Sequence, residues 1–374
     1  MVSSGIGWSR VICGCWVVVV ALASAASAQE VANAVYVRSD SNQTVVVAPR
    51  VRVQAPVSEA TRVSAIYAAD VWTSASIDIM ASASKKPVTE QRDELDVSVD
   101  HAWEDVTLTA AYRLSIEPDY VSHGGSGGFS YDFAQNNSTL AVGVSGSADR
   151  VGRAGDPQFS RDAGTLGARV SFTQVLGVGT LVQLMYEWSR GSGYQASPYR
   201  YVAIGQGGAC TVTSGAGAPS ALCVPETTPG KRLRHAFGLE LRHALSEVVS
   251  LRLAYRLYAD DWGVLSHTAR GELAWALDPD TILAARFRFY TQRAADFYRS
   301  YYAQPAVYVT RDKELSPLSS SRAGLELDRA WQLAGGHVLT STVSVGAIYY
   351  DYRDFPLLDH IVALEINAGL VFAL

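Results

Sequence analysis

The sequence predicts an all-β protein, a transmembrane antiparallel β-barrel of about 16 strands (about 14 to 18 fit the pattern) with a cleaved N-terminal signal peptide. Three observations predict this fold. Apolar and polar residues alternate with a period of two in one segment after another. The connections between these segments alternate between short and long. The chain begins with a stretch typical of exported proteins.

The N-terminal stretch has the three parts of a secretory signal. Arg10 precedes an apolar run over 11–23, and small residues follow up to Ala26 and Ala28. An N-terminal anchor helix is the alternative, but the run is short for a span, which needs about 20 residues. We therefore expect cleavage near Ala28, with 1–28 as the signal peptide and 29–374 as a single outer-membrane barrel.

The alternating segments each carry an apolar stripe on one face. In 249–258, Leu253 and Tyr255 alternate with Arg252 and Arg256. A shift of one residue would turn these arginines toward lipid, at a cost of roughly 2–4 kcal/mol each at the bilayer midplane. The segments with this pattern are 31–39, 43–54, 60–71, 89–100, 105–116, 121–132, 138–149, 161–173, 179–190, 231–243, 247–259, 265–276, 281–292, 319–331, 337–351 and 360–374.

The lengths of the connections predict the topology. The long connections are 72–88, 191–230 and 293–318, whereas 245–247, 278–280 and 334–336 are short. If both ends of the barrel chain are periplasmic, an even number of strands places every long connection on the outer side. A soluble β-sandwich or propeller would also alternate. Aromatic residues at the ends of strands of roughly ten residues favour the membrane, because they fit the two girdles of a barrel.

Composition excludes several classes of protein and indicates the partners. The chain has 31 basic and 36 acidic residues, so it lacks the basic excess typical of nucleic-acid binders. Outside the N-terminus no apolar run reaches about 20 residues, which argues against a helical membrane protein. The expected partners are outer-membrane lipid, the barrel-assembly machinery, which the terminal segment 360–374 would engage, and a periplasmic export partner. We expect no cofactor and no nucleic acid.

Charged residues on the inward face suggest what the barrel does. Six arginines project inward from three strands, and nearby glutamates can pair with them. A basic wall would favour anionic solutes or an exported anionic polymer such as a polysaccharide. The same residues could instead form a network that stiffens the wall. The predicted lumen residues are Arg234, Arg242, Arg252, Arg256, Arg286, Arg288, Glu240, Glu272 and Glu326.

Two further segments lie in predicted loops. Cys210 and Cys223 lie in a Gly/Ala/Ser-rich segment, and outside the cytosol such a pair is expected to form a disulfide. A metal site would need more ligands than these two, so no metal is predicted. The segment 70–79 is small and polar, and it fits either an inward-folded constriction or an ordinary outer loop.

The run 260–268 is the most distinctive motif of the chain. It contains Asp260, Asp261, Trp262, Gly263, Ser266 and His267. The favoured interpretation is a tight outer turn, in which the glycine supplies backbone freedom and the tryptophan packs. The alternative is a metal or acid–base site that also uses Asp296. A second motif, Gly124–Gly128, fits G-x-S-x-G, but it begins a strand and lacks the following helix of a nucleophile elbow.

The run D-D-W-G-x-x-S-H-T at 260–268, together with 192–199, 294–298 and 314–317, resembles a bacterial family of predicted outer-membrane β-barrels without assigned function. The resemblance extends from about Asp70 to the C-terminus. It implies a barrel, and it transfers no catalytic residue.

The sequence thus favours a porin-like passage across the outer membrane and not an enzyme, since about 16 strands enclose an aqueous interior. Two alternatives stay open. One is a closed structural or partner-binding barrel. The other is a barrel hydrolase, for which only the loop around Ser266 and His267 offers candidate residues.

Overall fold

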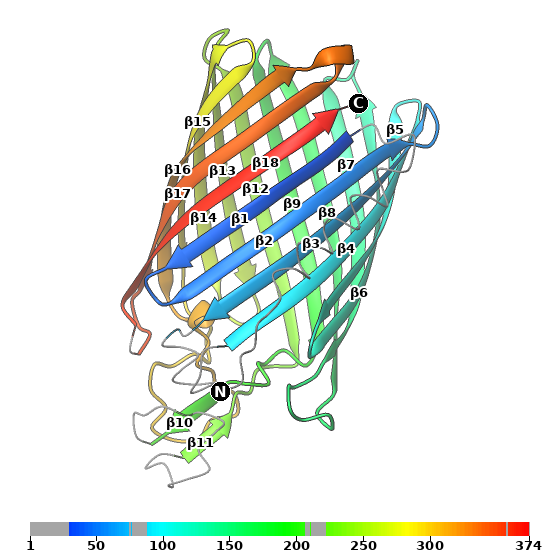
Figure 1. Cartoon of the computed structure of the whole chain (residues 1–374). Helices are drawn as coiled ribbons and strands as arrows, with labels where there is room; N and C mark the ends of the chain where they lie inside the picture. The colour runs from blue at the N-terminus through cyan, green and yellow to red at the C-terminus, as the bar shows by residue number, and fades with distance from the viewer. Residues whose placement is uncertain are drawn as a thin grey trace.

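A computed structural model describes residues 30–74, 76, 88–205, 210, 222–356 and 358–373. Sixteen antiparallel strands close into one barrel, and two short strands form a separate sheet beyond it (Figure 1). The barrel strands are β1 (Glu30–Asp40), β2 (Thr44–Pro56), β3 (Thr61–Ser74), β4 (Val88–Trp103), β5 (Val106–Glu117), β6 (Tyr120–Phe133), β7 (Ser138–Val151), β8 (Arg161–Gly177), β9 (Thr180–Gly193), β12 (Lys231–Ala244), β13 (Val249–Asp260), β14 (Leu265–Asp278), β15 (Thr281–Gln292), β16 (Leu318–Gln332), β17 (Val338–Tyr352) and β18 (His360–Ala373).

Each strand pairs with its neighbours in sequence order, and β1 closes the ring on β18. The long connections all lie at one end of the barrel, although some short connections, such as 118–119, lie there too. At one end, here the turn end, the connections are brief, such as 104–105, 178–179 and 279–280. At the other, the loop end, lie 75–87, 194–230 and 293–317. The prediction that every long connection lies on one side is therefore confirmed, as is the predicted strand number.

The described residues contain no helix long and apolar enough to cross a bilayer. The predicted signal peptide, 1–28, and the residues 77–79 of the 70–79 segment lie outside the described ranges. That 29–374 form a single domain stays a prediction.

The alternating pattern of the sequence becomes two faces of the barrel wall. Leu253 and Tyr255 of β13 are each 45 % exposed, and Phe287 of β15 is 53 % exposed, on the outward face. Large apolar residues exposed around a closed ring form the band that contacts lipid tails. At the turn end, Trp275 and Trp331 lie at the edge of this band, 53 % and 46 % exposed.

The Gly124–Gly128 motif, which fits G-x-S-x-G, lies wholly inside β6.

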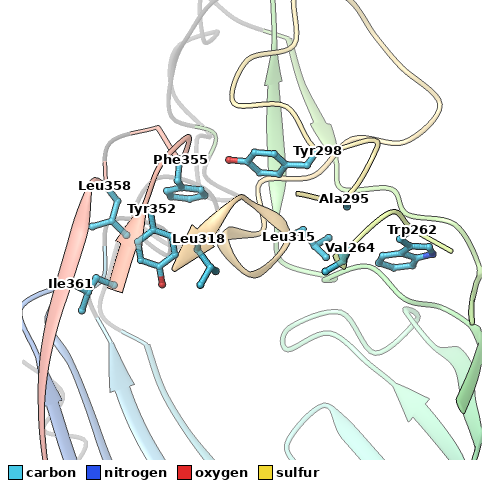
Figure 2. Packing of buried hydrophobic residues seen from close by; sticks show 10 residues of the cluster. All are labelled: Trp262, Val264, Ala295, Tyr298, Leu315, Leu318, Tyr352, Phe355, Leu358 and Ile361. Atoms are coloured by element: carbon cyan, nitrogen blue, oxygen red, sulfur yellow. The ribbon is translucent and has the colours of Figure 1, made fainter. Parts of the chain in front are cut away.

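Loop-end segments pack into a hydrophobic cap at the barrel mouth. Figure 2 shows the cluster running from the β17–β18 connection, through the start of β16, to the β13–β14 turn. Leu315 and Tyr298 of the 293–317 loop lie in its middle, 6 % and 4 % exposed. The cap residues are Trp262, Val264, Ala295, Tyr298, Leu315, Leu318, Tyr352, Phe355, Leu358 and Ile361. Burial of so many apolar side chains gives the loops a core of their own.

The 194–230 loop contains two strands that the sequence did not predict, β10 (Tyr201–Ile204) and β11 (Leu222–Pro225). The 194–230 loop docks on the 293–317 loop through two bridges, from Ile204 at the end of β10 to Tyr302 and from Thr227, which follows β11, to Val309. The predicted disulfide is present, with the Cα atoms of Cys210 and Cys223 5.8 Å apart. Each strand has only four residues, too few to form a visible alternation.

Candidate functional site in the barrel lumen

The inward face of β12–β16 concentrates arginine in three adjacent rows of paired residues. In the register of these strands the rows hold seven arginines and two glutamates. The first row runs from Arg242 through Arg252 and Glu272 to Arg286. The second, middle row runs from Glu240 through Arg270 and Arg288 to Arg322. The third row contains Arg256. Strand alternation places all of them opposite the apolar stripe, so they face the lumen.

Most of these arginines have carboxylate partners. Glu240 accepts from Arg242 Nε at 2.7 Å and from Arg252 Nη2 at 2.8 Å, which separates two like charges that face each other across β12 and β13. Arg286 Nε donates to Glu272 at 2.8 Å, and this guanidinium also contacts Glu326. The predicted lumen glutamates thus lie among the predicted arginines, and part of the wall is an ion-pair network.

Glu187 extends this network beyond the predicted set. It lies on β9 and accepts from Arg256 Nη2 at 2.8 Å.

The middle row differs because it sets three arginines directly opposite one another. Arg270 on β14 faces Arg288 on β15, which faces Arg322 on β16. Arg322 pairs with Glu365 of β18. Among the described residues, no ion pair forms to Arg270 or Arg288, and Arg288 Nε is buried without a hydrogen-bond partner. Like charges directly opposite in a sheet are destabilising, so this row is a site of unbalanced positive charge.

A lumen pocket of roughly 450 Å³ brings these groups together. Its charged lining residues are Arg252, Arg270, Glu272, Arg286, Arg288, Arg322 and Glu326. Arg234 lies apart, toward the loop end, opposite Asp260. Arg270 and Arg322 are not among the predicted lumen residues, although both lie on predicted strands at positions that alternate with the apolar stripe.

The wall across the lumen has the opposite charge. Strands β14 and β4 are eight steps apart in either direction around the 16-strand ring, so β3–β5 face β13–β15. Arg113 is held there between Glu94 and Asp96, at 3.1 and 3.0 Å. The inward acids of these strands are Asp70, Glu90, Glu94, Asp96, Asp100 and Glu117. A basic wall that faces an acidic wall creates a transverse field across the lumen.

The 260–268 run forms the β13–β14 turn at the loop end. The side chain of Asp260 is fully buried and accepts from Arg232, from Tyr258 Oη and from the backbone N–H groups of Trp262 and Val264. Arg232 also stacks on Trp262, 4.3 Å from the ring centroid. This network ties the turn to β12 and supports the cap that packs on Trp262.

Gly263 has φ +87°, and a Cβ there would lie 2.2 Å from Asp296 Oδ1. Only glycine therefore allows the 293–317 loop to approach this turn so closely.

The structure does not bring the residues of the alternative acid–base site together. Ser266 and His267 point to opposite faces of β14, and His267 lies on the lipid-facing side beside Tyr255. Asp261 accepts from the backbone N–H of Leu233, and Asp296 packs against Gly263. Within the described ranges no group of three or more His, Cys, Asp or Glu side chains could hold a metal ion.

A closed antiparallel ring with an outward apolar band and a polar interior defines an outer-membrane β-barrel protein. A family model described as "Protein of unknown function (DUF3570)" matches residues 21–166 and 158–353. The chain therefore belongs to this family. No curated protein gives a significant match to the sequence.

Solved structures with a similar fold are outer-membrane barrels. A bacterial polysaccharide outer membrane secretin shares 10 % identity at a TM-score of 0.50, covering 92 % of this chain and 98 % of that one. OprD of Pseudomonas aeruginosa shares 9 % identity at 0.46, covering 93 % and 96 %.

The siderophore receptor PirA of Pseudomonas aeruginosa shares 11 % identity at a TM-score of 0.46, with 91 % of this chain covered. The chain spans only 60 % of the length of that receptor. At these identities the similarity is one of fold alone.

Proposed function

We propose that the barrel is a passage for anionic solutes, and that the row of Arg270, Arg288 and Arg322 is the point at which they bind in the lumen. The observation that carries this proposal is the direct opposition of three arginines with too few carboxylates to balance them. A stiffening network would place an acid between them, as Glu240 lies between Arg242 and Arg252. An anion in the lumen would supply the missing charge.

The acidic wall and the cap shape this passage. Because β3–β5 present carboxylates to the same lumen, the overall preference for anions over cations should be modest. A solute that also carries a positive group would be oriented, with its anionic end toward β14. The cap packs against Tyr258, Tyr290 and Tyr350 near the loop end of the basic wall, so it narrows the entry on that side.

The test is planar-bilayer recording of the purified barrel with a salt gradient. The double variant Arg270→Gln and Arg288→Gln should lower the anion-to-cation permeability ratio by roughly two- to fivefold, as expected for a lost fixed charge at a constriction. The matched control is Glu94→Gln with Asp96→Asn on the acidic wall, which should raise the same ratio.

The two rival functions give different results in the same experiment. A closed structural or partner-binding barrel would show no conductance, either as wild type or after the cap is loosened. A network that only stiffens the wall would leave the permeability ratio of the Arg270/Arg288 variant at the wild-type value. An export channel for an anionic polysaccharide would conduct, and the added polymer would block the current of the wild type more than that of the variant.

A further inference from the structure

The outward surface carries a repeated pairing of tyrosine with histidine. Tyr112 Oη contacts His123 Nδ1 at 2.8 Å, Tyr186 contacts His235 at 2.8 Å, and Tyr255 contacts His267 at 2.6 Å. In these three pairs the ring centroids are 6.3, 6.1 and 6.1 Å apart.

The rings of Tyr349 and His360 form a fourth pair with the same spacing, 6.0 Å. Four pairs with nearly one ring spacing, three of them hydrogen-bonded, indicate a shared role.

The register of the four pairs is identical. Tyr255 lies opposite Ala269, and His267 is two residues from Ala269 toward the loop end. The other three histidines are offset in the same direction, by two residues, from the partners of Tyr112, Tyr186 and Tyr349. Such diagonal neighbours lie on one face of the sheet. Each pair joins two strands that connect at the loop end: β5–β6, β9–β12, β13–β14 and β17–β18 (Figure 1).

The pairs lie at one edge of the lipid-facing band. Tyr112 is 47 % exposed, and Val362, two residues beyond His360 along β18, is 44 % exposed. The four histidines lie within the first five residues of strands that start at the loop end. The chain has seven histidines in all. The other three lie at the turn end, where His101 and His243 contact threonines and His337 packs on Phe372.

In the three hydrogen-bonded pairs the tyrosine hydroxyl occupies Nδ1, so Nε2 is the ring nitrogen that remains for a group outside the pair. A tyrosine hydroxyl that donates to Nδ1 leaves the ring proton on Nε2, which is then a donor. In the described part of the chain, no hydrogen bond satisfies Nε2 in these pairs. Donors arranged around a barrel at the level of the lipid headgroups fit an acceptor that repeats in that plane, and in a membrane leaflet this is the headgroup phosphate.

We infer that the four loop-end Tyr–His pairs bind the phosphate groups of lipids in the leaflet on the loop side. The pairs then hold the barrel at a fixed depth and retain a small number of headgroups around it. A fifth hairpin, β3–β4, has the same register with Asp93 in place of histidine, and Tyr67 Oη donates to it at 2.6 Å. A carboxylate there repels phosphate, so the β3–β4 hairpin is not one of the sites.

The test is native mass spectrometry of the full barrel taken from vesicles of phosphatidylglycerol or of digalactosyldiacylglycerol, which has no phosphate. Wild type should retain phosphatidylglycerol in preference to the galactolipid. Replacement of His123, His235, His267 and His360 by Phe keeps the rings and removes the N–H donors. It should weaken retention at each site by roughly two- to tenfold, which corresponds to one net hydrogen bond.

The matched control replaces His101, His243 and His337 by Phe at the turn end, and it should retain lipid as wild type does. Asp93→His should add retained phosphatidylglycerol. The shift of the folded barrel on unheated gels confirms that each variant has assembled. Equal loss in both histidine sets, no loss in the loop-end set, or equal retention of the two lipids by wild type would each overturn the proposal.

Discussion

Arg270 and Arg288 face each other across β14 and β15, and among the described residues neither has a carboxylate in an ion pair with it. By contrast, Arg242 and Arg252, which face each other across β12 and β13, have Glu240 between them. The opposition of Arg270 and Arg288 lies on the inward face, where a solute can reach it. This arrangement, which costs stability at one place in the wall, supports the anion-binding site proposed above.

The opposition of Arg270 and Arg288 predicts that a substitution which raises stability here will lower the preference for anions. Arg270→Glu would place a carboxylate opposite Arg288 and beside Arg252 and Arg256. An opposite-charge pair contributes roughly 0.2–1 kcal/mol, so the variant should resist heat or urea slightly better than wild type. Its anion preference in bilayer recordings should fall. A variant that is both less stable and unchanged in selectivity would contradict the proposed site.

The cap should control conductance. Leu315 is 6 % exposed in the middle of the cap, and Leu315→Ser should loosen the 293–317 loop, at a local cost of roughly 2–4 kcal/mol. We expect larger and noisier single-channel currents from this variant. Val307→Ser is the control, because Val307 belongs to the same loop and is 81 % exposed. Equal currents from both variants would show that the cap does not narrow the entry.

The approach of the 293–317 loop to the β13–β14 turn depends on Gly263. Gly263→Ala should cost about 1–2 kcal/mol for the positive φ, plus the cost of displacing Asp296. Gly155→Ala is the control, since Gly155 has φ +80° and its added Cβ would meet nothing within 4 Å. The measure is the temperature at which the folded barrel is lost on gels. Adding Asp296→Ala should recover only the part of the loss that comes from the clash.

Glu226 should make the docking of the 194–230 loop on the 293–317 loop sensitive to pH. Burial raises the pKa of this carboxyl above its ordinary value, although Arg200 beside it acts in the opposite direction. It accepts hydrogen bonds from Thr310 Oγ1 and from the backbone N–H of Ser197, so it joins the 194–230 loop to the 293–317 loop.

A raised pKa means that the docked loops bind a proton more tightly than the separated ones. The docking is therefore most stable below about pH 4.5, the ordinary pKa, and weakens as the pH rises through the raised value.

Hydrogen exchange of 222–227 and 309–312, corrected for intrinsic rates, measures this effect. Protection should decrease as the pH rises toward neutral, and Glu226→Gln should remove the dependence. Glu314→Gln, at an exposed carboxyl of the 293–317 loop, should leave the dependence as it is in wild type. Protection that increases with pH in the wild type would refute the assignment.

Local pattern alone determined the barrel. Alternation in a strand fixes which residues face lipid, and a one-residue shift would expose Arg252 and Arg256 to hydrocarbon, so sequence and register specify each other. The lengths of the connections determined which end of the barrel carries the long loops. The same reasoning located the cysteines, the tight turn at Gly263 and six of the lumen arginines.

Tertiary structure decided the relationships between strands. Which arginine faces which depends on the stagger of β14, β15 and β16, and the opposition of β4 to β14 depends on closure of the ring with 16 strands. Neither is a local property of the chain. The Tyr–His pairs are also invisible in sequence, because Tyr186 and His235 are 49 residues apart and meet only when β12 pairs with β9. The cap required packing between loops whose sequences carry no period, so only the folded chain shows that they form one core.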